Sequence, residues 1–166
     1  MKLIYHPNPI LEQELETVDI ENLDFDPKEL KEEMVDLMYH KEGIGLAANQ
    51  VGLNKRLFVM STQERDQSVI CINPTILQYT EETAKDLEGC LSFPDIYVEV
   101  KRPKEILVAF NDENLEEQVF KMEGYLARVY LHELDHTLGI TFKDRVSRAR
   151  WGMAQRKAKK AKRLSA

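Results

Sequence analysis

The stretch Gly124–Gly139, GYLARVYLHELDHTLG, determines how this chain is built around a chemical site. Its apolar residues recur with helical spacing, which predicts a helix packed against a core: Leu126, Val129, Leu131, Leu134 and Leu138. On that helix His132 and His136 are one turn apart on the same face, so both imidazoles can reach one metal ion. Glu133 lies beside them and can reach a water held by that ion without becoming a ligand.

Two histidines do not complete a catalytic metal site, because a third protein ligand is needed. Downstream of His136 the sequence has Phe142 where one zinc-protease pattern has a third histidine, and Asp144 is the only acid. We therefore expect the third ligand upstream. Cys90, in the segment EGCLS, is the preferred candidate since a thiolate binds zinc or ferrous iron strongly. The alternatives are His6 and His40, whereas the apolar surroundings of Cys71 predict a core residue.

The rest of the chain predicts an α+β fold. Asp26-Pro27-Lys28-Glu29 indicates a helix start, and the helix runs to Gly43. Short β-branched or alternating runs predict antiparallel strands at 55–62, 68–73, 96–102, 105–111 and 116–123. A last helix is predicted to begin near Ser147. We thus expect an N-terminal helix, antiparallel strands around a central metal-binding helix, and a basic C-terminal helix.

The charge is distributed unevenly along the chain. Its 166 residues carry a net charge of −6, yet residues 141–166 hold ten Lys or Arg and one acid, so residues 1–140 carry −15. We predict a metal-dependent catalytic domain over 1–146 and a basic helical extension over 147–166. Trp151, Ala154, Ala158 and Ala161 form a narrow stripe on that extension and cations cover the rest, which favours a phosphate-bearing partner. A solvated terminus is the alternative.

Composition excludes several other classes of protein. Two cysteines form at most one bridge, so a disulfide scaffold is excluded. No apolar run approaches the roughly 20 residues that cross a bilayer. The N-terminus MKLIYHPNPILEQELE has no apolar core typical of a secretory signal. We expect a cytoplasmic protein.

Three separated segments together resemble peptide deformylase: GIGLAANQ at 43–50, EGCLS at 88–92 and HELDH at 132–136. The resemblance covers most of residues 1–145. It implies one divalent metal ion held by Cys90, His132 and His136, with Fe²⁺ preferred and Zn²⁺, Ni²⁺ or Co²⁺ possible. It also implies removal of the formyl group from N-formylmethionyl peptides. Some members have a C-terminal helix that binds ribosomal RNA, and this basic tail is similar to it in place and charge.

The resemblance also implies a role for individual residues. Glu133 would act as general base and then as general acid, while the Gln50 amide and the Leu91 backbone N–H would stabilise the oxyanion. Gly43, Ile44 and Gly45 would line the substrate cleft.

The residues themselves suggest how the peptide is held. The candidate walls of an apolar methionine pocket are Ile44, Leu91 and Val129, although each of them is by default a core residue. Arg102 is a candidate contact for the peptide backbone or a carboxylate, with a surface cation as the alternative. The chain departs from the family's usual residues at Asn49, Leu131 and Thr137-Leu138. Leu131 removes a polar side chain beside the site, so the hydrogen bonding around the ligands is expected to differ.

Two other functions remain open at this level. A His-Glu-x-x-His endopeptidase would share the helix but lacks the downstream ligand. A ribosome- or RNA-binding protein with a structural metal would require a closed site, usually with four protein ligands.

Overall fold

The structure is a computed structural model that describes residues 1–61 and 67–165. The main helices are α1 (Pro27–His40), α2 (Gly124–Thr137) and α3 (Arg148–Ser165). The seven strands are β1 (Gly45–Ala47), β2 (Leu57–Met60), β3 (Val69–Tyr79), β4 (Thr83–Cys90), β5 (Phe93–Pro103), β6 (Glu105–Asn111) and β7 (Glu117–Glu123). The short 3-10 helices are η1 (Pro9–Glu12), η2 (Ala48–Val51) and η4 (Phe142–Arg145). The predicted α+β class is confirmed.

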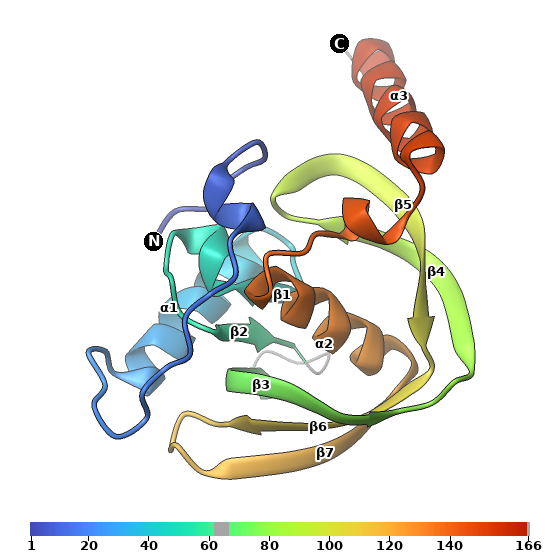
Figure 1. The fold of residues 1–166 in the computed structure, drawn as a ribbon. Coiled ribbons are helices and arrows are strands. Elements are labelled where there is room, and N and C mark those ends of the chain that lie inside the picture. Colours follow the sequence, from blue (N-terminus) through green and yellow to red (C-terminus); the bar gives the residue numbers. More distant parts are fainter. Residues whose placement is uncertain (62–66, 166) are drawn as a thin grey trace.

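The strands form two separate antiparallel units. Five of them make one sheet in the order β1-β2-β3-β6-β7, and β4 pairs only with β5. Figure 1 shows α2 in the middle of the molecule, with the sheet on one side and the long β4–β5 ribbon curving around the other. Both β1 and β4 therefore have one edge that no described strand occupies. The central position of α2 is what the sequence predicted for the helix that carries HELDH.

Helix α1 begins as its sequence predicts. The Asp26 carboxylate accepts hydrogen bonds from the N–H groups of Lys28 and Glu29, and Pro27 occupies the first helical position. Its buried face packs against β1 and β2 in a core cluster that includes Met34, Met38, Leu46 and Leu57. This packing anchors the segment that leads into the cavity described below.

The predicted strands are present, but several bounds differ, and β5 begins at Phe93 rather than at residue 96. Strand β3 extends to Tyr79, well beyond the predicted end at residue 73, and irregular register at Ile72/Thr75 and Ile76/Gln78 accompanies the extension. Strand β4 was not predicted, because TAKDLEGC is polar and contains Asp and Gly. The predicted strand 55–62 is shorter, since β2 ends at Met60, and its last residue Thr62 lies outside the described residues.

The C-terminal helix α3 is anchored to the body at its first turns. Trp151 packs edge-on against Phe93 and Phe142, at ring-centroid distances of 5.8 and 5.4 Å, and Ala154 joins the same cluster. Two exposed ion pairs add contacts with β5: Arg150 pairs with Glu99 near the start of α3, and Lys162 pairs with Asp95 in its last turn. Beyond this cluster α3 projects from the body in Figure 1. Among the described helices, none is long and apolar enough to cross a membrane.

Candidate metal centre

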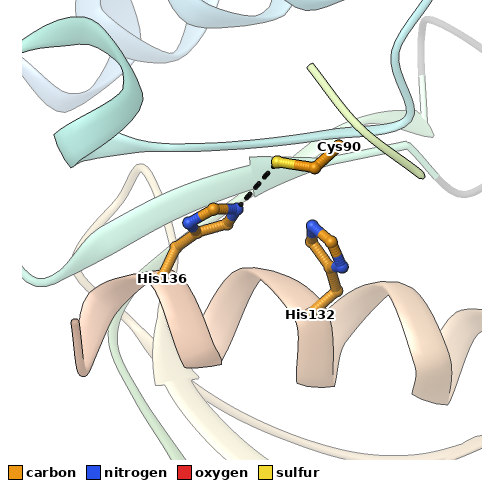
Figure 2. Close-up of side chains that lie close together, drawn as sticks. All are labelled: Cys90, His132 and His136. Carbon is orange, nitrogen blue, oxygen red and sulfur yellow. Dashed lines mark hydrogen bonds between the residues drawn. The ribbon is translucent and has the colours of Figure 1, made fainter. Parts of the chain in front are cut away.

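The central helix and the end of β4 bring three metal-ligating side chains together. Figure 2 shows His132 and His136 rising from α2 toward Cys90. The Cys90 Sγ lies 3.3 Å from His136 Nε2, and one ligand atom from each residue lies within 4.8 Å of the others. Within residues 1–61 and 67–165 this is the one such group. Both alternative ligands lie elsewhere, since His6 stacks on Phe93 and His40 ends α1.

This group fits a divalent metal ion. Two imidazoles and a thiol are the donors that zinc and ferrous iron accept. His136 is fully buried, and its Nδ1 has no hydrogen-bond partner among the described residues, while Nε2 faces the thiol. Cys71, by contrast, lies on β3 and is buried in the core cluster between the sheet and α2, as the sequence predicted.

Glu88 orients His132 from the side opposite to the ligand group. The His132 Nδ1–H donates to Glu88 Oε2 at 2.9 Å, which leaves Nε2 free to act as a ligand. Burial by itself would raise the pKa of Glu88, but the hydrogen bonds from His132 and Arg102 outweigh it and lower the pKa to about 2. Glu88 is therefore ionised and holds the imidazole in one tautomer.

Behind Glu88 lies a buried network of charged side chains. Arg102 donates to both Glu88 oxygens and, at 2.6 Å, to Asp135. Arg128 donates to Glu88 at 2.8 Å and to the carbonyl oxygens of Val100 and Ala84. Asp135 also pairs with Arg145. This network joins α2 to β4 and β5, and it fixes the position of the ligand residues relative to one another.

Arg102 lies in a different environment from either one considered in the sequence. It is only 4% exposed, so a surface cation is wrong, and it is not part of the cavity wall formed by the described residues. Its guanidinium is paired with Glu88 and Asp135, which leaves the expected peptide contact without support. Strand β5 alternates buried and exposed residues, and position 102 falls on the buried face.

Glu133 is a buried carboxylate that faces the glycine segment. It is 4% exposed, its Oε2 has no hydrogen-bond partner among the described residues, and burial raises its pKa to about 7. A Cβ at Gly45 would lie 2.3 Å from Glu133 Oε1, so only glycine allows the carboxylate this approach. A Cβ at Gly43 would likewise lie 2.6 Å from the Leu91 side chain. Because Gly43 and Gly45 lack a Cβ, the glycine segment can pack closely against both Leu91 and Glu133.

Gln50 is held by hydrogen bonds at both ends of its amide. Its Oε1 accepts from the Ala47 N–H at 2.9 Å, and its Nε2 donates to Ser92 Oγ at 3.0 Å. The same Nε2 lies 3.6 Å from Cys90 Sγ. Ser92 Oγ in turn donates to the Ile4 carbonyl, and the Ile4 N–H donates to the Gln50 carbonyl. The N-terminal segment thus joins the glycine segment to EGCLS.

One cavity of about 650 Å³, between the edges of β1 and β4, gives access to the site. Its wall includes the ligands Cys90 and His132, and it also includes almost every other residue that the sequence singled out: Gly43, Ile44, Gly45, Gln50, Leu91, Val129 and Glu133. Leu131 instead packs in the core, and Asn49 donates its side-chain N–H to the His136 carbonyl. The structure therefore brings the three sequence motifs to a single concave surface.

Four polar residues of the site were not predicted individually. Glu88 and Asp135 lie inside the motifs and Ser92 ends one, but nothing in the sequence shows which side chain each would face. Arg128 lies one turn before His132 on α2, and that spacing was the one available signal.

Comparison with known proteins agrees with this geometry. The family model described as polypeptide deformylase matches residues 1–151. The peptide deformylase of Rhizobium meliloti (strain 1021) is 40% identical over 162 residues, which cover 96% of this chain and 92% of that protein. The crystal structure of peptide deformylase from Thermotoga maritima superposes with a TM-score of 0.82 at 40% identity, covering 88% of this chain and 97% of that one.

A second solved structure extends the match to the C-terminal region. The crystal structure of a peptide deformylase from Legionella pneumophila gives a TM-score of 0.88 at 33% identity, covering 99% of this chain and 96% of that one. The chain therefore belongs to the polypeptide deformylase family, and it is a metal-dependent hydrolase that removes the N-terminal formyl group from N-formylmethionyl peptides of nascent proteins.

Proposed function

We propose that Glu133 moves the proton in this deformylation and that Gln50 and the Leu91 backbone N–H stabilise the oxyanion. The observation that supports this most directly is the Glu133 carboxylate, which lies buried in the cavity wall with one oxygen unpartnered among the described residues. It shares that wall with Cys90 and His132. A proton acceptor and the ligand group therefore face the same space, as amide hydrolysis requires.

We assign the divalent ion to Cys90, His132 and His136, with Fe²⁺ as the preferred occupant and Zn²⁺, Ni²⁺ or Co²⁺ as alternatives. When bound, such an ion supplies Lewis acidity and lowers the pKa of water. The same donor set accepts each of these ions, so the choice between them rests on metal availability as well as affinity.

The chain's own residues carry the proton and the developing charge. Glu133 removes a proton from the attacking water and then gives it to the departing methionine amine. The Gln50 amide is kept in one orientation by Ala47 and Ser92, which directs its Nε2 toward the ligand group. A donor fixed in advance in this way needs no reorganisation as the carbonyl oxygen becomes negative. Arg102 acts through Glu88 as a positioning residue rather than as a contact for the peptide.

We propose that the peptide lies in extended form between the open edges of β1 and β4. Both edges line the cavity, and each offers backbone groups to a third strand. Ile44, Leu91 and Val129 then form walls for the methionine side chain. Formyl is the smallest acyl group, so a narrow carbonyl site excludes acetyl by steric conflict.

The expected selectivity is testable with matched peptides. We expect formate release from formyl-Met-Ala-Ser, with kcat/KM about a hundredfold above that for removal of acetyl from acetyl-Met-Ala-Ser. Amine release measures both reactions, and casein serves as the control for endopeptidase activity. Equal rates on the two acyl peptides would refute the steric argument, and casein cleavage would favour the endopeptidase alternative.

The ligand number also bears on the structural-metal alternative. A structural site is usually closed by four protein ligands, whereas three are grouped here among the described residues, beside a cavity. This arrangement favours a catalytic ion over a structural one.

We further propose that α3 binds ribosomal RNA and that the protein acts in the cytoplasm. Residues 147–166 contain eight Lys or Arg and no acid. Their exposed cations include Lys157, Lys159, Lys160 and Arg163. The division into a catalytic domain over 1–146 and an extension over 147–166 remains our proposal. Because Trp151 and Ala154 pack on the body, α3 is an attached element, and Ala166 lies outside the described residues.

Neutralising the exposed cations is a sharper test than truncation after Val146, since truncation would uncover Phe93 and Phe142. We expect the quadruple variant Lys157→Gln, Lys159→Gln, Lys160→Gln and Arg163→Gln to bind ribosomes more weakly. The slope of the logarithm of the ribosome association constant against the logarithm of the salt concentration should become smaller in magnitude by about 3. Sedimentation with ribosomes across a salt series measures it.

A matched quadruple variant controls for net charge. It replaces Lys2, Lys28, Lys85 and Lys101, all exposed, with Gln and should retain the full salt slope. Equal ribosome binding by the two quadruple variants, or ribosome binding that does not depend on salt, would refute the RNA proposal. Both variants should turn over formyl-Met-Ala-Ser at the unchanged rate.

A further inference from the structure

We propose that two copies of this chain associate edge to edge through strand β7, as a symmetric dimer with Val119 at its two-fold axis. β7 is the last strand of the five-stranded sheet, and no described strand pairs with its free edge. Figure 1 shows it along the outside of the molecule. The cavity wall formed by the described residues contains no residue of β7, so this contact is independent of the deformylase function.

The edge carries two exposed apolar side chains, one on each face of the sheet. Val119 is 52% exposed and Phe120 is 49% exposed. Phe120 lies on the α2 side of the sheet, because its ring stacks on Phe110 of the core cluster. Successive side chains of a strand point to opposite faces, so Val119 lies on the other side. A free strand edge with exposed apolar side chains is a template for pairing with another strand.

Two hydrogen bonds beside the ends of β7 determine which of its backbone groups face outward. The Asp112 N–H donates to the Glu116 carbonyl at one end, and the Gly124 N–H donates to the Lys104 carbonyl at the other. In an antiparallel pair, residues that bond to the neighbouring strand alternate with residues that do not. The even-numbered residues of β7 therefore bond to β6. The N–H and C=O groups of the odd-numbered residues point to the free edge.

The charges along this edge select one register for two antiparallel copies. With the two-fold axis at Val119, the two Val119 residues face each other, and Glu117 faces Lys121 of the second copy on both sides of the axis. An axis one residue later would place Glu117 opposite Glu123, and an axis at Lys121 would bring two lysines together. Like charges directly opposite each other destabilise a strand pair. An axis at Gln118 would place Lys121 opposite the turn, where the second copy has no strand.

The same register brings the two exposed aromatic rings together on the α2 side of the sheet. Phe120 lies opposite Gln118 of the second copy, so the two Phe120 residues are diagonal neighbours, a separation that aromatic side chains can bridge. The contact is confined to one strand from each copy and is smaller than a standard interface. We therefore expect reversible association with a Kd on the order of 10–100 µM.

Sedimentation equilibrium from about 1 µM to about 1 mM covers the range expected for so small an interface. The parent chain should change from monomer to dimer over this range and should not associate further. Val119→Pro should stay monomeric, since it removes an N–H that points to the free edge and leaves the bonds between β6 and β7 intact. Val119→Thr keeps the N–H and a β-branched side chain, so it is the matched control and should dimerise.

Charge reversal tests the register. Glu117→Lys and Lys121→Glu each place like charges opposite one another on both sides of the axis, so each should weaken dimerisation about tenfold or more. The double variant Glu117→Lys/Lys121→Glu restores opposite charges and should dimerise like the parent chain, as should an equal mixture of the two single variants. Lys101→Glu makes the same change of net charge at an exposed position of β5 and should leave the Kd unchanged. Circular dichroism checks that each variant is folded, because Lys121 also pairs with Glu105 of its own chain.

Three results would contradict the proposed dimer. A parent chain that stays monomeric up to about 1 mM would overturn it and would leave the edge to a strand of another protein. Dimerisation of folded Val119→Pro would place the contact elsewhere on the surface. Single reversals that block association, without rescue by the double variant or by the mixture, would exclude the register centred on Val119.

Discussion

Replacing Glu133 with Ala is expected to lower kcat on formyl-Met-Ala-Ser at least a thousandfold while the metal stays bound. Positioned acids and bases each contribute about a hundredfold to ten-thousandfold, and Glu133 is proposed to serve in both proton transfers. The carboxylate is not one of the three grouped ligands, so its removal leaves Cys90, His132 and His136 in place. We therefore expect this variant to lose its activity and to keep its metal content.

The measurement pairs amine release with metal analysis of the same preparation. Glu33→Ala, which removes an exposed carboxylate from α1, is the matched control and should behave like the parent chain. An active Glu133→Ala protein would refute the proposed mechanism. An inactive protein that has also lost its metal would show that Glu133 acts on the centre itself rather than on the proton.

Replacing Cys90 with Ala is expected to reduce metal affinity more than a hundredfold and to abolish turnover with it. Residues that only support metal ligands typically cost tenfold to a hundredfold when changed, and the loss of a ligand exceeds that. The remaining imidazoles cannot compensate, because the described residues place no other His, Cys, Asp or Glu in the group.

The chain contains its own control for this experiment. Cys71→Ala removes the other thiol from a fully buried core position, so it should lower stability by about 1 kcal/mol and keep the metal. Chelator competition on anaerobically purified protein measures the affinity, and metal analysis of the parent chain tests the preferred Fe²⁺. Full metal content in Cys90→Ala would remove Cys90 from the ligand set.

The helix that carries the histidines could be predicted because its information is local. One-turn spacing places His132 and His136 on the same face whatever the rest of the chain does. The capping of α1 by Asp26 is local in the same sense. The contact between Glu133 and Gly45 could not be predicted in this way, because the two residues are 88 positions apart in the sequence. Only the fold shows that position 45 must lack a Cβ to leave room for the carboxylate.

Strand β4 and the charged network could not be predicted for a physical reason. A buried polar residue is tolerated when its partners satisfy it, and those partners come from distant segments. Glu88 is buried because Arg102, Arg128 and His132 surround it, though its neighbours in sequence indicate a solvated loop. Arg102 was misplaced for the same reason.

The anchoring of α3 has a practical consequence for spectroscopy. Trp151 is the single tryptophan of the chain, and its ring contacts Phe93 and Phe142. Phe142 in turn lies 5.8 Å from the His132 ring, and Phe93 is the cross-strand partner of Cys90. Trp151 therefore lies at the base of the basic helix, and only the Phe142 ring separates it from His132 of the ligand group. We therefore expect Trp151 fluorescence to report detachment of the helix, without any label and without substrate.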